Sequence, residues 1–176
     1  MKKFIFILLC ALPIFAGNLS LKEGFVAAHT EMLMDSTIDP LNNVLTADIS
    51  MHGDDLLSLK GTLTVEMSLF VSDNSDRDKN MDEATEVNTY PLASYTITDV
   101  TKTEGANNYV LEGTLDFHGK QNPLTFNAEI MHADKTVTIN ATSMILVSEY
   151  GLEMPCMMFM CVRDQVDLFA KAVLSQ

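Results

Sequence analysis

The residues best suited to chemistry form a sulfur-rich segment near the C-terminus. Residues 154–161 read Met-Pro-Cys-Met-Met-Phe-Met-Cys, so four methionines and two cysteines lie in one short stretch. Thioether and thiolate sulfurs are the ligands that Cu(I) prefers, and two cysteines in an oxidising compartment can form a disulfide. In an extended strand, however, Cys156 and Cys161 face opposite sides, about 16 Å apart at ~3.3 Å per residue. We therefore favour a hydrophobic role for this segment over a disulfide, and a disulfide over copper.

No other pattern of reactive side chains stands out. His29, His52, His118 and His132 are scattered, without the spacing of metal ligands. The sequence lacks the Gly-x-Ser-x-Gly, His-Glu-x-x-His and glycine-rich phosphate-binding motifs that mark hydrolases, zinc peptidases and nucleotide-binding proteins. We therefore predict no catalytic residue, no metal site and no cofactor beyond a bound lipid, in a protein that is not an enzyme.

The acidic composition argues against two classes of partner. Among 176 residues, 24 Asp and Glu outnumber 11 Lys and Arg, for a net charge of −13. Nucleic-acid binding needs a basic surface, because phosphate contacts draw their affinity from counterion release. A polybasic patch that docks on anionic lipid needs the same basic charge. The hydrophobic fraction of 47% and the length indicate instead one acidic domain with a real core.

The first residues have the pattern of a secretory signal peptide. Lys2 and Lys3 precede an apolar run from Phe4 to Ala16, which ends in a small residue. The run is shorter than the about 20 residues that a bilayer span requires, and no other segment approaches that length. We predict a cleaved signal peptide over residues 1–16, a single domain over residues 17–176, export to the periplasm, and no stable membrane anchor.

A period of two dominates the rest of the chain and predicts antiparallel strands. Short segments of turn-forming residues, such as 52–55 and 104–108, separate the alternating runs. The polar stretch 73–89 instead predicts a loop with a short helix. Strands spaced in this way favour a barrel of about eight strands or a sandwich. The runs of alternating apolar residues are 63–71, 111–118, 124–130, 137–147 and 166–174.

Three segments resemble the YceI-like polyisoprenoid-binding proteins. Residues 72–81, followed by Tyr-Pro at the start of 90–95, are similar to the Arg-Asp step, short helix and aromatic-Pro pair of that family. Residues 109–126 resemble its strand–turn–strand signature, in which a Gly-x-Leu step leads to a Gly turn and a Pro. Residues 150–168 are similar to its closing hairpin. The resemblance covers roughly residues 60–172.

The resemblance implies a lipocalin-like antiparallel β-barrel that encloses an elongated apolar cavity for an isoprenoid or similar amphiphilic chain. It implies a periplasmic binding protein and does not imply catalysis. The sequence departs from the family pattern at Asn80-Met81, where the family often has His-Leu, and residues 24–30 match only loosely. We therefore carry over no polar contact from position 80 and nothing from residues 24–30.

Alternation and resemblance together predict which side chains line the barrel. Each such residue is also compatible with plain core packing, because alternation does not distinguish core from ligand contact. Gly113, beside Leu115 and Phe117, predicts room for a ligand tail. The predicted ligand-binding residues are Leu63, Val65, Met67, Leu69, Leu111, Gly113, Leu115, Phe117 and Phe126 from the strands, with Met157 and Phe159 from the last loop.

The function hypothesis is therefore a periplasmic carrier for an isoprenoid or another long-chain amphiphilic lipid. Two alternatives stay open: a copper-binding protein that uses residues 154–161, and a ligand-free barrel that acts as an interaction module. The sequence also leaves open the identity of the lipid, its delivery partner, a homodimer, and the oxidation state of Cys156 and Cys161.

Overall fold

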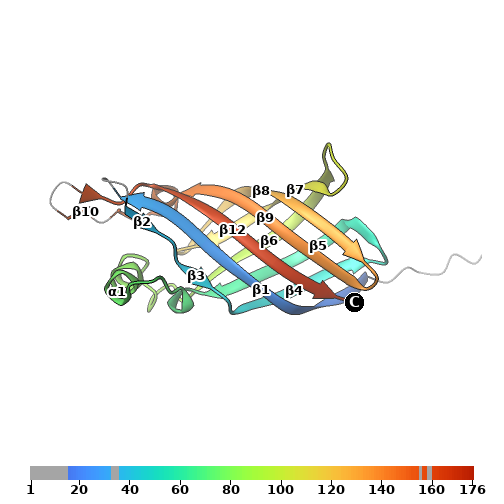
Figure 1. Cartoon of the computed structure of the whole chain (residues 1–176), viewed down its shortest axis with the longest axis horizontal. Coiled ribbons are helices and arrows are strands. Elements are labelled where there is room, and N and C mark those ends of the chain that lie inside the picture. Colours follow the sequence, from blue (N-terminus) through green and yellow to red (C-terminus); the bar gives the residue numbers. More distant parts are fainter. Residues whose placement is uncertain (1–15, 33–35, 155, 158–159) are drawn as a thin grey trace, which may run out of the picture.

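Eight long strands close into an antiparallel barrel in the computed structural model, as predicted (Figure 1). The structure describes residues 16–32, 36–154, 156–157 and 160–176. The barrel strands are β1 (Ala16–Met32), β4 (Leu45–His52), β5 (Asp55–Glu66), β6 (Leu92–Lys102), β7 (Asn108–Phe117), β8 (Lys120–Ala133), β9 (Thr136–Leu146) and β12 (Gln165–Ser175).

Neighbouring strands of the barrel follow one another along the chain, except where β1 lies between β12 and β4 and closes the barrel. From β4 to β9 each strand pairs with the next one along the sequence, and β12 then pairs with β9. The long strand β1 closes the barrel because residues 16–19 pair with β4 and residues 20–29 pair with β12, while its last residues pair with β2 (Ser36–Ile38). Gly24 allows the two backbones to approach at this closure, since a Cβ atom there would lie 2.4 Å from the Lys171 main-chain oxygen.

Shorter elements gather at one end of the barrel, on the left in Figure 1. The helix α1 (Ser75–Ala84) falls within the predicted loop-and-helix segment, and the Asn74 side chain caps it by accepting from the main-chain N–H groups of Asp76 and Arg77. The other short elements are β2 (Ser36–Ile38), β3 (Leu41–Asn42), β10 (Cys156–Met157), β11 (Met160–Cys161) and the 3-10 turns η1 (Met67–Leu69) and η2 (Val147–Tyr150).

The opposite end of the barrel is filled by packed side chains. They come from β4, β5, β8, β9 and β12, close to the hairpin turns of that end, and each is no more than 1% exposed. This half therefore forms an ordinary hydrophobic core. Its most deeply buried members are Ile49, Met51, Leu59, Ile130, Val137 and Leu174.

One predicted strand ends earlier than its alternation indicated. The pattern over residues 63–71 predicts one continuous strand, but β5 ends at Glu66 and the chain continues as η1. A 3-10 turn repeats every three residues, so Met67 and Phe70 are buried while Leu69 is 38% exposed. Leu69 therefore does not face the barrel interior, which corrects its predicted place among the ligand-binding residues.

Gly113 on β7 lies beneath the ring of Tyr95 on β6. A Cβ atom at Gly113 would lie 2.6 Å from the Tyr95 Cζ atom and 2.3 Å from the Thr96 main-chain oxygen. The two residues are diagonal neighbours across the strand pair. In this arrangement an aromatic ring packs over the glycine, in the space that a side chain would otherwise fill. Gly113 therefore leaves no room for a ligand tail, because Tyr95 already occupies that space.

The Tyr95 hydroxyl is held by main-chain oxygens. Its Oη atom lies 3.0 Å from both the Leu111 oxygen and the Leu124 oxygen, and its ring packs edge-on against Phe126 with 4.8 Å between centroids. Burial raises the pKa of Tyr95, so the hydroxyl stays a neutral donor. Tyr95 thus links β6, β7 and β8 within the wall.

We predict that Gly113→Ala lowers the free energy of unfolding by about 2 kcal/mol or more, because the new methyl group meets a main-chain oxygen and a buried ring. Tyr95→Phe should cost about 1–2 kcal/mol, since buried carbonyl groups lose their donor. Urea unfolding measures both changes. The matched control is Gly17→Ala, where the nearest atom to the new Cβ is 4.0 Å away and the expected change is within about 0.5 kcal/mol. Wild-type stability of Gly113→Ala would contradict this packing.

Candidate functional site

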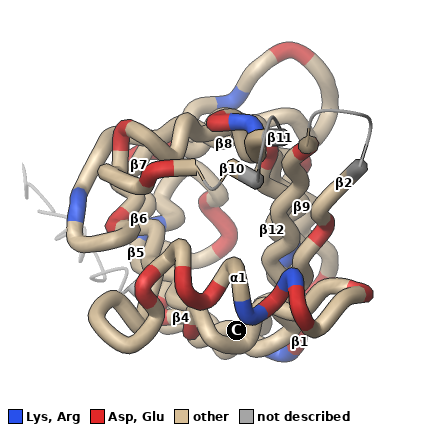
Figure 2. The backbone as a smooth tube through the Cα atoms, turned by 90° about the vertical axis from the view of Figure 1, so that its left-hand side faces the viewer, with Lys and Arg blue, Asp and Glu red and all other residues tan. Residues whose placement is uncertain are grey.

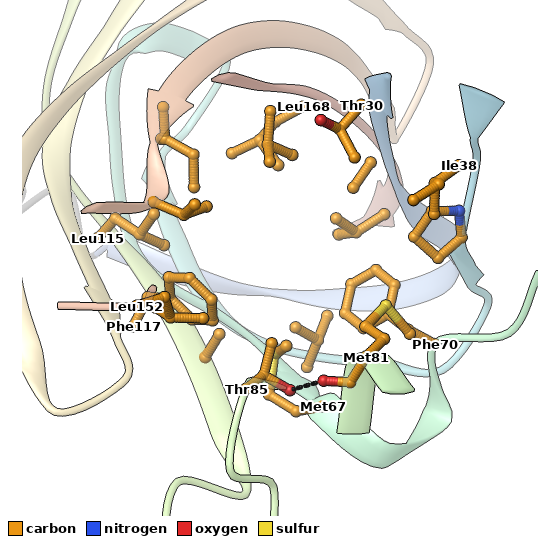
Figure 3. Close-up of a pocket in the computed structure, with 18 of the residues that line it drawn as sticks. Thr30, Ile38, Met67, Phe70, Met81, Thr85, Leu115, Phe117, Leu152 and Leu168 are labelled. Atoms are coloured by element: carbon orange, nitrogen blue, oxygen red, sulfur yellow. Dashed lines mark hydrogen bonds between the residues drawn. The ribbon is translucent and has the colours of Figure 1, made fainter. Parts of the chain in front are cut away.

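The half of the barrel nearest α1 encloses a cavity of about 730 Å³. This volume lies in the range of about 300–1,000 Å³ that is typical of small-molecule sites. Figure 3 shows Leu115 and Phe117 of β7 and Leu168 of β12 around its edge, together with Phe70 and with Met81 of α1. Apart from polar groups near α1, its surface is almost entirely aliphatic and aromatic.

A row of alanines makes room for the cavity. Ala128 on β8 pairs with Ala141 on β9, and Ala141 pairs with Ala170 on β12. Ala141 and Ala170 both line the cavity, as does Val26, the partner of Ala170 on β1. Because neighbouring strands each contribute only a methyl group at this level, the wall is recessed.

Seven of the predicted ligand-binding residues lie at the cavity wall, although their contact with a ligand stays a prediction. Leu69 and Gly113 do not line it, for the reasons given above. Phe159 and the side chain of Met157 lie outside the described residues. The seven are Leu63, Val65, Met67, Leu111, Leu115, Phe117 and Phe126.

Sequence reasoning missed the part of the wall that comes from β1 and α1. Val26, Ala28 and Thr30 line the cavity, but residues 24–28 are apolar or small on both faces of the strand and show no alternation. Met81 on α1 contributes a thioether at the α1 end. The sequence did contain a signal for Ala141 and Ala170. Their strands alternate between apolar and polar residues, and the inward-facing residues at these two positions are small.

The polar groups of the cavity gather at its α1 end, which we call the mouth. Figure 2 looks at this end of the barrel and shows acidic residues on α1 and the surrounding loops. Farther inside, the Tyr95 hydroxyl is bonded to main-chain oxygens. The mouth residues are Thr30, Arg77, Asn80, Glu83, Thr85 and Glu153.

Hydrogen bonds fix α1 and the segment after it in place across the mouth. Arg77 Nη1 donates to the Thr37 main-chain oxygen at 3.1 Å and to Asp73 Oδ1 at 3.3 Å. Beyond the helix, Glu86 Oε2 lies 3.0 Å from His118 Nε2, whose Nδ1 is 3.2 Å from the Tyr150 main-chain oxygen. These contacts tie the helical segment to β2, to the β7–β8 turn and to η2.

A disulfide between Cys156 and Cys161 lies beside the mouth, with Cys156 lining the cavity. The two cysteines are cross-strand partners in the β10–β11 hairpin, so the assumption of a single extended strand, on which we gave a disulfide less weight, was wrong. The bond occupies both sulfurs that a copper site would use as thiolates. In the described part of the chain, no group of three or more His, Cys, Asp or Glu is arranged to hold a metal ion, and no helix has the length and apolarity needed to cross a bilayer.

Known structures share this fold at low sequence identity. BcnA of Burkholderia cenocepacia superposes with a TM-score of 0.74 at 16% identity, over 85% of this chain and 95% of that one. A Campylobacter jejuni YCEI protein gives 0.70 at 16% identity, over 100% and 99%. A polyisoprenoid binding domain from Saccharophagus degradans, implicated in plant cell wall breakdown, gives 0.68 at 15% identity, over 90% and 97%.

The sequence itself matches one family profile. No curated protein matches the chain, but the profile of the YceI-like domain matches residues 19–174. That range runs from the first buried residue of β1, Leu19, to the last buried residue of β12, Leu174. The protein therefore belongs to the YceI-like family.

Proposed function

We propose that this protein binds an isoprenoid or another long-chain amphiphilic lipid in the barrel cavity and carries it in the periplasm. The observation that carries the proposal is the distribution of polarity: an apolar cavity, closed by core at one end, with polar side chains at the other. The polyisoprenoid binding domain among the similar structures supports the same ligand class.

Burial of the lipid tail supplies the binding energy. Each CH₂ group withdrawn from water contributes about 0.8 kcal/mol, so a ten-carbon stretch yields several kcal/mol without any specific hydrogen bond. The lining on β12 extends from Val166 to Ala172, about 20 Å along the strand at ~3.3 Å per residue. An extended tail fits this space with its polar end at the mouth.

We infer that the cavity binds its ligand without catalysis. The charged side chains among the described lining residues are Arg77, Glu83 and Glu153, all at the mouth. Tyr95, inside the cavity, is neutral and bonded to main-chain oxygens. Nothing in this arrangement pairs a nucleophile with a base.

Export is the second part of the proposal. The predicted cleavage after Ala16 falls at the first residue of β1. Gly17 is the partner of Met51, and Leu19, the first buried residue of the strand, is the partner of Ile49. A cut after Ala16 therefore leaves the barrel pairing of β1 almost complete.

We predict that the protein recovered from the periplasm of its own host begins near Gly17. Intact mass and N-terminal sequencing measure this directly. A variant with Lys2 and Lys3 changed to Glu should accumulate uncleaved, because the positive n-region is lost. Full-length wild-type protein in the soluble periplasm would contradict the proposed leader.

We predict that Ala141→Leu weakens lipid binding while leaving the fold intact. In a filled core the larger side chain would cost about 1–3 kcal/mol, but here it enters empty apolar space, so stability should stay within about 1 kcal/mol of wild type. Binding of geranylgeraniol, measured by equilibrium dialysis, should weaken at least about tenfold, because the leucine side chain occupies cavity space that the lipid tail would fill.

The matched control is Thr142→Leu, which adds an apolar side chain to the exposed face of the same strand. It should bind geranylgeraniol like wild type. Native mass spectrometry of wild-type protein from its own host should also show an adduct of lipid mass. If Ala141→Leu lowers stability sharply and the wild-type protein retains no lipid, the barrel is a filled interaction module and the carrier proposal is wrong.

A further inference from the structure

The mouth carries more negative than positive charge. Of its charged residues, Glu83 and Glu153 are acidic and Arg77 is basic. Arg77 is also engaged, since its Nη1 contacts Asp73 Oδ1 and the Thr37 main-chain oxygen. On α1, Lys79 lies 3.6 Å from Asp76. The described mouth thus lacks the clustered cations by which proteins bind phosphate groups.

The helix adds to this negative potential. The cavity-lining residues at the end of α1 are Glu83 and Ala84, followed by the C-cap Thr85. The C-terminal end of a helix carries partial negative charge, whereas anions bind at helix N-termini. A phosphorylated lipid would therefore meet repulsion at the mouth.

The neutral hydroxyls of the mouth offer acceptors. Thr85 Oγ1 donates to the Met81 main-chain oxygen at 2.8 Å, the bond drawn in Figure 3. Thr30 Oγ1 donates to the Gln165 main-chain oxygen at 2.8 Å. A hydroxyl has a single hydrogen, and in both threonines it is already donated, so toward a ligand each can act only as an acceptor. The carboxylates of Glu83 and Glu153 accept hydrogen bonds as well.

We propose that the mouth selects lipids whose polar end donates hydrogen bonds and carries no negative charge, so that isoprenoid alcohols bind in preference to their phosphorylated forms. This inference rests on the proposed lipid-binding function. It follows from two independent features, the charge of the mouth and the direction of its threonine hydrogen bonds. The tail supplies affinity, and the mouth decides which polar end is accepted.

The test compares ligands with one tail and different polar ends. Geranylgeraniol, its methyl ether and geranylgeranyl diphosphate are each titrated against the full protein by equilibrium dialysis at low and at high salt. We expect the alcohol to bind at least tenfold more tightly than the diphosphate and at least threefold more tightly than the ether, which cannot donate. Raising the salt concentration should reduce the difference in affinity between the alcohol and the diphosphate. The carboxylates of the mouth are exposed, and the Debye length is only about 8 Å at 0.15 M.

Charge reversal at the mouth gives the matching variant. Glu83→Lys with Glu153→Lys should strengthen diphosphate binding at least tenfold, so that the preference for the alcohol is lost. Lysine is favourable in the last turn of a helix, so the fold of α1 is preserved. Glu104→Lys with Glu129→Lys is the control, because it changes the net charge equally at exposed positions on the other half of the barrel.

The outcomes separate the inference from the proposed function. Equal affinity of wild-type protein for alcohol and diphosphate, independent of salt, overturns the inference while lipid binding stands. An equal gain of diphosphate binding in the control pair also overturns it, since net charge and not the mouth would then decide. If neither ligand binds, the proposed function fails and the inference fails with it.

Discussion

The hollow in this barrel depends on the size of a few side chains at one level of the wall. An eight-stranded barrel is just wide enough for ordinary side chains to fill it, so an empty interior requires small residues on adjacent strands. Ala141 and Ala170 meet this requirement as direct cross-strand partners in the cavity wall, and Ala128 continues the row on β8. Farther along the same strands, large aliphatic side chains fill the interior completely. The cavity, its closed end and its direction of entry all follow from this change in size.

The polarity of the interior follows a similar division. Tyr95 keeps its hydroxyl within the wall, where main-chain oxygens of β7 and β8 accept it, so the ring adds apolar surface and the polar atom is satisfied. Among the described residues that line the cavity, the charged ones lie where the barrel opens, beside α1 and the disulfide hairpin. In the proposed complex, a lipid tail would be held by burial alone, whereas its polar end would meet directional groups.

Sequence reasoning reached the barrel through strands with one buried and one exposed face. Alternation located β7, β8, β9 and β12, the polar stretch located α1, and three motifs identified the family.

The prediction failed where the period changed or was absent. The turn η1 follows a period of three and places Leu69 outside, and β1 is apolar or small on both faces near Val26. Cys156 and Cys161 were misjudged because strand geometry was applied across a hairpin. The prediction for Gly113 was wrong because the Tyr95 side chain on the neighbouring strand fills the space beside the glycine. The sequence of β7 alone does not reveal that contact.

The pairing of β1 with β12 joins opposite ends of the chain. Leu21 lies beside Leu174, so the final seam forms between residues separated by nearly the whole sequence. Loop closure over such a separation is entropically costly, and folds rich in distant pairings fold slowly, on the scale of milliseconds to seconds. The hairpins from β4 to β9 need only local contacts, but the barrel cannot close until the last strand has been synthesised. The nascent chain therefore remains open along one seam until β12 is available.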